Sequence, residues 1–116
     1  MAQDKLKIGA SKFSEVTILD GVSLIDDATQ TLTLTGMRSG IIFAKYVTAA
    51  GAYYTGTYSL YISNDTLAIL ILDNSTDFDD ADTDAKFDVY SNSGVITLKN
   101  RTGATVTAYI TALLAE

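Results

Sequence analysis

The chain has 116 residues, a formal net charge of −6 and no His, Cys, Pro or Trp. Without Cys it has no disulfides, zinc–thiolate sites or thiol nucleophiles, and without His it lacks the usual general base and the commonest metal ligand. Its 8 Lys and Arg residues are scattered along the sequence. They form no basic stripe of the kind that nucleic-acid binding requires, so we expect no nucleic-acid partner.

No membrane-crossing or signal segment is expected. The first residues, MAQDKLKIGASK, contain no apolar stretch typical of a signal peptide. The longest apolar run, residues 67–72, is far too short to cross a bilayer. A hydrophobic content of 47% with only 19% charged residues is high for a small monomer, and it favours surface that is buried against other subunits.

The N-terminal part, residues 1–13, is weakly patterned and is predicted to be an arm. We interpret residues 1–5 as a partly ordered tail. Residues 6–13 are compatible either with the same tail or with a segment that grips a neighbouring molecule. One domain is predicted over residues 14–116, a length that is sufficient to bury a core.

Alternating patterns then predict a series of short strands. Strands are expected at residues 15–20 and 22–25, separated by a turn at Gly21. The QTLTLT segment over residues 30–35 alternates cleanly and turns its leucines inward. The next strand is expected over residues 41–47, although neither of its faces is fully polar.

The middle of the chain predicts two strands joined by a tight turn. Residues 53–62, YYTGTYSLYI, alternate, and Gly56 within them indicates a bulge or a close backbone approach. Asn64 and Asp65 form a turn into residues 66–73. That last strand is apolar on both faces, so one face is expected in the core and the other against a partner chain or a crossing loop.

The C-terminal part follows an acidic loop over residues 74–84. Strands are predicted at residues 86–91, 95–99 and 105–114, and the last two are expected to form a hairpin closed by the turn at residues 100–103. The whole pattern predicts an all-β protein, an antiparallel, jelly-roll-like β-sandwich of about eight strands.

The acidic loop is the one constellation that suggests chemistry. Asp80, Asp82 and Asp84 stand at the one-three-five spacing of a calcium loop. However, Ala85 replaces the glycine of an EF-hand, and Ser91 replaces its closing glutamate. A looser Ca²⁺ site and a solvated loop both remain open, and we favour the solvated loop. The candidate Ca²⁺ ligands are Asp77, Asp79, Asp80, Asp82 and Asp84.

Paired carboxylates also serve glycosidases, but nothing distinguishes such a pair here from a surface loop. No catalytic or cofactor-binding residue is predicted, and we expect the protein not to be an enzyme. The tyrosines of residues 53–61 suit either a sugar-stacking platform or a core and subunit interface, of which we favour the second. The predicted self-interface residues are Tyr53, Tyr58, Tyr61, Leu67, Ile69, Leu70, Ile71 and Leu72.

Several segments together resemble small virion proteins of tailed bacteriophages. They are SGIIF at residues 39–43, the Tyr- and Thr-rich strand at residues 53–62, VYS at residues 89–91, GVITLKNRTG at residues 94–103 and TAYI at residues 107–110. The resemblance is to jelly-roll or sandwich modules that decorate or cement capsids or form head fibres.

This resemblance implies a non-enzymatic homo-oligomer, often a trimer, that bridges copies of the major capsid protein. Such a protein is synthesised in the host cytoplasm and ends on the capsid surface. The residues expected to dock on the capsid are Leu6, Ile8, Lys12 and Phe13. The alternative is a fibre-tip or lectin-like module that binds a host-surface glycan through its tyrosines.

Overall fold

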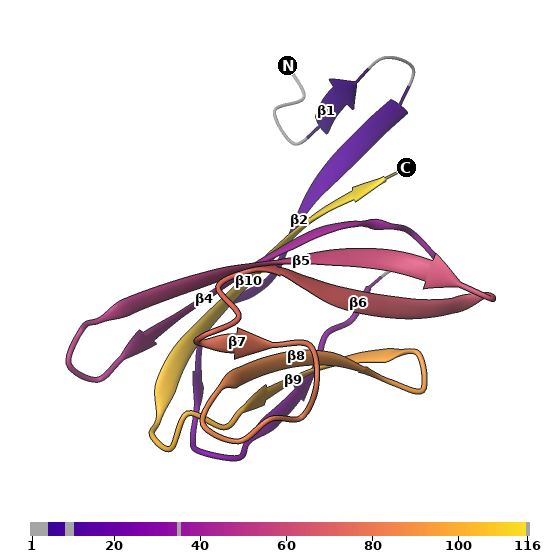
Figure 1. The fold of residues 1–116 in the computed structure, drawn as a ribbon. Coiled ribbons are helices and arrows are strands. Elements are labelled where there is room, and N and C mark those ends of the chain that lie inside the picture. The colour runs from indigo at the N-terminus through magenta and orange to yellow at the C-terminus, as the bar shows by residue number, and fades with distance from the viewer. Residues whose placement is uncertain (1–4, 9–10, 35, 116) are drawn as a thin grey trace.

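The computed structural model describes residues 5–8, 11–34 and 36–115, and over these residues it consists of strands and loops without a helix. The side chains of residues 5–8, 11 and 12 are not described. Figure 1 shows the chain folded into two sheets that lie one above the other. The strands are β1 (Lys5–Ile8), β2 (Ser11–Leu24), β3 (Thr29–Thr31), β4 (Gly40–Thr48), β5 (Tyr53–Ser63), β6 (Thr66–Asp73), β7 (Phe78–Asp79), β8 (Phe87–Asn92), β9 (Val95–Asn100) and β10 (Val106–Ala115).

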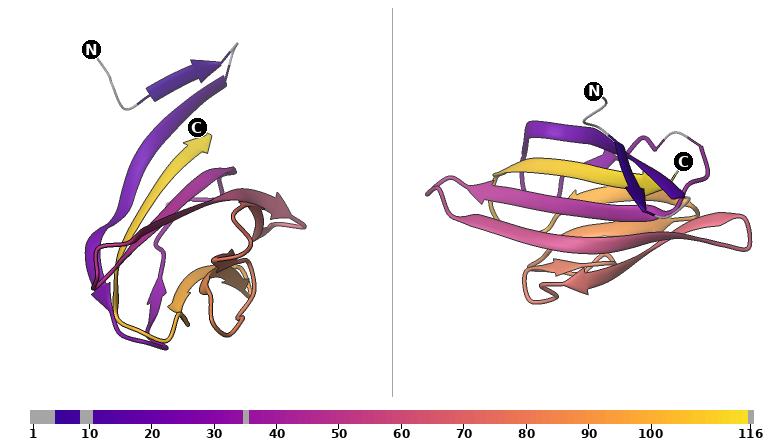
Figure 2. Two further views of the ribbon diagram at one scale, coloured as in Figure 1. Left: turned by 60° about the vertical axis from the view of Figure 1, so that its left-hand side comes forward. Right: turned by 90° about the horizontal axis from the view of Figure 1, so that it is seen from above.

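The two sheets differ in size. The larger has six strands in the order β1-β2-β10-β4-β5-β6, and every neighbouring pair in it is antiparallel. The smaller has four strands in the order β3-β9-β8-β7, of which only β7 and β8 run parallel. Figure 2 shows the smaller sheet packed against one side of the larger, curved one. The β-sandwich predicted from the sequence is confirmed.

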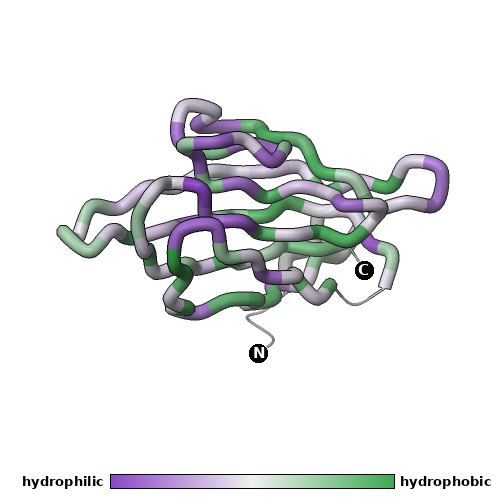
Figure 3. Tube along the Cα trace, turned by 90° about the horizontal axis from the view of Figure 1, so that it is seen from below, coloured by the Kyte–Doolittle hydropathy of each residue, from purple (hydrophilic) through white to green (hydrophobic). Residues whose placement is uncertain are grey.

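The core lies between the sheets and follows the alternation of the strands. Figure 3 shows hydrophobic and hydrophilic stretches succeeding one another along the chain. Strand β10 pairs with β2 on one side and with β4 on the other, and its even-numbered residues are buried. They face the inner side of the smaller sheet. The buried hydrophobic residues of β8, β9 and β10 are Phe87, Val89, Ile96, Leu98, Val106, Ala108, Ile110, Ala112 and Leu114.

Aromatic rings join the two layers. Tyr46 on β4 stacks on Phe87 on β8, with ring centroids 4.9 Å apart. The hydroxyl of Tyr58, which is fully buried, donates a hydrogen bond of 3.1 Å to the carbonyl of Asp79 on β7. The aromatic side chains on the inner face of the larger sheet are therefore core residues that fix the smaller sheet in place.

The expected hairpin between β9 and β10 is wrong, because these strands belong to different sheets. Asn100 explains the crossing. Its side chain is buried, and its amide donates to the carbonyls of Leu24 and Ala104 at 3.0 and 2.8 Å. Its Oδ1 accepts from the backbone N–H and the hydroxyl of Thr102 at 3.1 and 2.7 Å. Asn100 therefore ties the end of β9 to the end of β2 and to the start of the connection into β10.

Other details also differ from the prediction. Gly21 does not end a strand: β2 runs through it, and Gly21, at φ 77, forms a bulge where Asp20 and Val22 pair with adjacent residues of β10. The strand expected over residues 30–35 is assigned only as far as Thr31. Strand β7 lies inside the predicted acidic loop, where Phe78 is fully buried.

The N-terminal segment contributes strands to the larger sheet. Strand β1 pairs with the beginning of β2, so that Lys5 lies opposite Ser14 and Leu6 opposite Phe13. This hairpin extends beyond the sandwich, above the C-terminal end of β10 (Figure 1). Residues 1–4, which include most of the predicted tail, lie outside the described residues.

Candidate functional site

The outer face of the larger sheet, turned away from the core, carries the exposed apolar residues of the central and edge strands. Ile41 on β4 and Leu70 on β6 both lie opposite Ser59 of β5, and Tyr61 lies two residues further along β5. Leu72, at the bulge of β6, lies on the same face. We call Ile41, Tyr61, Leu70 and Leu72 the edge patch, and their exposed fractions are 37%, 41%, 51% and 55%.

The predicted self-interface residues divide between the core and this face. Tyr58 and Ile69 are buried in the core, so their assignment to an interface is wrong: neither has surface to offer a second molecule. Leu67 and Ile71 are partly buried and pack against the same core. Tyr53, Tyr61, Leu70 and Leu72 are exposed. The alternation along β5 and along β6 up to its bulge produces this division, because neighbouring residues point to opposite faces.

The free edge of β6 is partly sealed by side chains from the smaller sheet. The backbone N–H of Ile71 donates to Oδ2 of Asp80 at 2.9 Å. The hydroxyl of Ser91 donates to the carbonyl of Leu67 at 2.8 Å. An edge strand with open N–H and C=O groups recruits further strands, and these contacts occupy two of those groups. Another molecule is therefore expected to bind the outer face of the sheet and not the edge of β6.

A shallow groove of about 390 Å³ crosses the outer face next to the edge patch. Its floor is the backbone around Ala44 and Gly56, which lie opposite each other on β4 and β5. Phe43, Thr57 and Thr111 stand on one side, and Lys45, Thr55 and Tyr109 stand on the other. The Nζ of Lys45 lies 4.3 Å from the ring centroid of Tyr109 and 5.4 Å from that of Tyr53.

The acidic loop uses its carboxylates in contacts with the protein itself. Asp82 pairs with Arg101 at 2.9 Å and with Lys99 at 3.3 Å, and the Arg101 hydrogen bond lowers the pKa of Asp82. Asp79 accepts a 2.6 Å hydrogen bond from the Thr83 hydroxyl, which lowers the pKa of Asp79.

The remaining candidate ligands are dispersed. Asp80 caps the edge of β6, Asp84 lies 3.5 Å from Arg101, and the backbone N–H of Asp77 donates to Asn74. No three acidic side chains among the described residues converge on one point in the way that a metal site needs. The calcium hypothesis gains no geometric support and stays a hypothesis.

Asp88 is a buried carboxyl group that the sequence reasoning missed. Its Oδ2 accepts a hydrogen bond of 2.8 Å from the Thr83 backbone N–H, and its Oδ1 has no hydrogen-bond partner within the described part of the chain. Desolvation, with smaller effects from Asp79 and Asp82, raises the pKa of Asp88 to about 7. The FDVYS segment alternates, so Asp88 lies on the face of β8 that is turned away from the core-facing Phe87 and Val89. Asp88 is nevertheless buried, because the acidic loop folds back over β8 and Thr83 contacts it.

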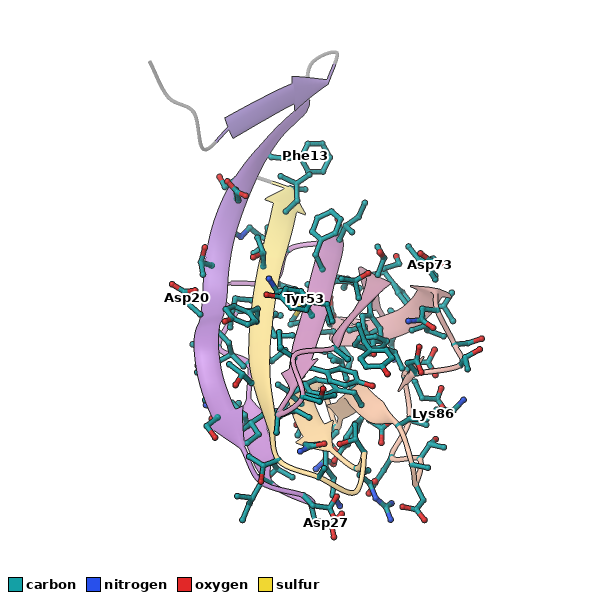
Figure 4. All side chains as sticks on the ribbon, turned by 90° about the vertical axis from the view of Figure 1, so that its left-hand side faces the viewer. Phe13, Asp20, Asp27, Tyr53, Asp73 and Lys86 are labelled. Carbon is teal, nitrogen blue, oxygen red and sulfur yellow. The ribbon has the colours of Figure 1, made fainter. Side chains whose placement is uncertain are left out.

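The predicted capsid-docking residues lie together in one hairpin. Leu6 and Ile8 are in β1, while Lys12 and Phe13 are at the start of β2. Phe13 lies opposite Ala115, near the C-terminal end of β10 (Figure 4). Strand β1 is an edge of the larger sheet. It pairs with β2 on one side, and among the described residues no strand pairs with its other side.

No protein family, curated protein or solved structure matches the chain. Over the described residues, no helix is long and apolar enough to cross a membrane.

Proposed function

We propose that the chain is a non-enzymatic structural protein that self-associates through the edge patch and decorates or cements a bacteriophage capsid. The observation that carries the self-association is the exposure of Leu70 and Leu72 on the second apolar face of β6. In the described structure nothing covers this face. An apolar patch on an otherwise acidic small protein is typical of a surface that binds another molecule.

A second copy of the chain suits this surface best. A sheet face is broad and gently twisted, and two such faces stack readily with their apolar side chains interdigitated. The four side chains of the edge patch carry no charge, so two copies of a protein with net charge −6 meet there with little desolvation of ionic groups. The partly sealed β6 edge favours closed stacking over open-ended strand addition.

The β1–β2 hairpin is the segment that we assign to capsid docking. Among the described residues one side of β1 is unpaired, and an extended segment of a coat subunit can add there as a further strand. A copy that binds only the assembled lattice adds its binding free energy to lattice stability by mass action. An oligomer of such copies bridges neighbouring coat subunits and resists their separation.

The test of the virion role is a capsid stability measurement. The protein is added to capsids that have been stripped of it, and the temperature of DNA release is recorded. We expect the release temperature to rise in a saturable manner, and a version that lacks residues 1–13 to lose the effect while it remains folded. An unchanged release temperature, despite saturating protein, contradicts the proposed role.

Glycan binding is a second candidate function, and one observation favours it. The groove beside the edge patch combines aromatic rings, hydroxyl groups and a lysine.

A further inference from the structure

We propose that the groove across β5, β4 and β10 binds a sugar that carries a carboxylate group. This inference rests on the second candidate function, glycan binding, and specifies the class of sugar; it does not depend on self-association or on a role in a virion. It rests on the shape of the groove, on its uncommitted hydroxyl groups and on the position of Lys45.

The shape suits a small polar ligand. A volume of about 390 Å³ falls in the range of small-molecule sites. The inward-facing positions Ala44 and Gly56 leave only backbone on the outer side, so the sheet surface is lowest between the rows of larger side chains. A flat ring can lie along this depression with its edges against both rows.

Hydroxyl groups line the depression. Thr55, Thr57 and Thr111 come from two different strands, and among the described residues their hydroxyls make no hydrogen bonds within the protein. Each hydroxyl offers one donor and two acceptor positions. Such a set complements the alternating donors and acceptors of a polyol, whereas an apolar ligand would leave the three hydroxyls unpaired.

Aromatic surface borders the same depression. Phe43 is 46% exposed at one side, and the ring of Tyr109, which lies beside Gly21 and contacts the Lys45 ammonium group, borders the other side. The C–H groups on the face of a sugar ring pack well on the negative face of an aromatic ring. The groove thus offers both kinds of contact that a pyranose needs.

The charge of the groove specifies an acidic sugar. Lys45 is the one cationic residue among those that line it, and the rings of Tyr53 and Tyr109 hold its ammonium group in place. Asp20 lies opposite Tyr109 and Asp73 lies opposite Thr57, so negative charge borders both ends. The carboxylate of a bound sugar is therefore favoured only next to Lys45, away from Asp20 and Asp73. A polyphosphate would bring more negative charge than one lysine offsets.

The test uses D-glucuronate, with D-glucose as the matched neutral sugar, and follows amide shifts by NMR titration. We expect glucuronate to shift the amides of Ala44 and Gly56 and to bind about tenfold more tightly than glucose, a difference of about 1.4 kcal/mol, because its carboxylate can accept a charge-assisted hydrogen bond from Lys45.

Two variants separate the charge from the hydroxyl groups. Lys45→Gln should reduce glucuronate affinity to that of glucose, and Thr57→Val should weaken both sugars. The control Lys86→Gln, whose lysine contacts Ser75 outside the groove, should bind as the wild type does. Absence of binding by the wild type at millimolar sugar overturns the proposal, as does undiminished glucuronate binding by a folded Lys45→Gln variant. Shifts that map elsewhere on the protein also overturn it.

Discussion

The ring of Phe78 packs directly against the backbone of Gly56: a Cβ atom added at position 56 would lie 2.8 Å from two of the ring carbons. Gly56 belongs to β5 of the larger sheet, and Phe78 belongs to β7 of the smaller one. Phe78 is fully buried and also contacts the rings of Tyr46, Tyr58 and Phe87. The absence of a side chain at position 56 thus sets the distance between the two layers at this point.

Gly56→Ala is expected to destabilise the protein by about 1–3 kcal/mol, as overpacking of a well-filled core does. Chemical unfolding measures this loss, with Ser59→Ala on the outer face of the same strand as the control. Combining Gly56→Ala with Phe78→Leu should cost less than the sum of the two single changes, because the smaller side chain makes room for the added methyl group. Strictly additive effects would show that the two residues do not limit each other.

Asn100→Ala is expected to cost roughly 3 kcal/mol or more of the free energy of unfolding. The change removes the partner of several buried backbone groups, and each unsatisfied group costs about 1–3 kcal/mol. Asn92→Ala is the matched control, since Asn92 is exposed at the end of β8 and should change the stability little. Equal urea midpoints for both variants would contradict the role that we assign to Asn100.

The buried carboxyl of Asp88 predicts an unusual pH dependence. Its pKa rises from 3.8 to about 7 on folding, so the folded state holds this proton more tightly than the unfolded state does. The free energy of unfolding should therefore fall as the pH rises from about 4 to 7 and level off above. The lowered pKa values of Asp79 and Asp82 act in the opposite direction at lower pH: their stabilisation is lost as the pH falls below 3.8.

Asp88→Asn should abolish this slope between about pH 5.5 and 7, and unfolding measured at several pH values from about 5.5 to 8 checks it. The chain has no His, so between about pH 5.5 and 8 no other side chain titrates at its ordinary pKa. Besides Asp79 and Asp82, the groups that face Asp88 are Arg101 and Tyr58. The control Asp65→Asn changes an exposed turn residue and should keep the slope. If the free energy of unfolding of Asp88→Asn keeps the same pH dependence, another group must cause it.

Local patterns were sufficient to predict the strands that alternate. The strand predicted over residues 105–114 corresponds to β10, and Asn64 and Asp65 adopt the positive φ angles, 51° and 59°, of a tight hairpin turn. Gly56 was expected to allow a bulge or a close approach, and the ring of Phe78 supplies the close approach.

Pairing between strands was harder to predict, because alternation reports a face and not a neighbour. The turn at residues 100–103 has the composition of a hairpin, and only the contacts of Asn100 with the distant Leu24 show that the chain changes sheets there. Strand β7 was missed because Phe78 is a single apolar residue within an acidic segment.

The candidate surface was only partly predictable for the same reason. The two apolar faces of β6 indicated that one of them needs a partner chain or a crossing loop, and the structure shows that Leu70 and Leu72 on one face are exposed. The groove, by contrast, depends on the register of three strands that places Lys45 between Thr55 and Tyr109.

Self-association through the edge patch is tested most directly by light scattering during size-exclusion chromatography. We expect the wild-type mass to be a small multiple of 12.4 kDa, and the double variant Leu70→Lys with Leu72→Lys to elute as a folded monomer. Ile25→Lys, which changes an exposed apolar residue outside the edge patch, should keep the wild-type mass. A wild-type protein that stays at 12.4 kDa at high concentration, or a double variant that still associates, would contradict the account.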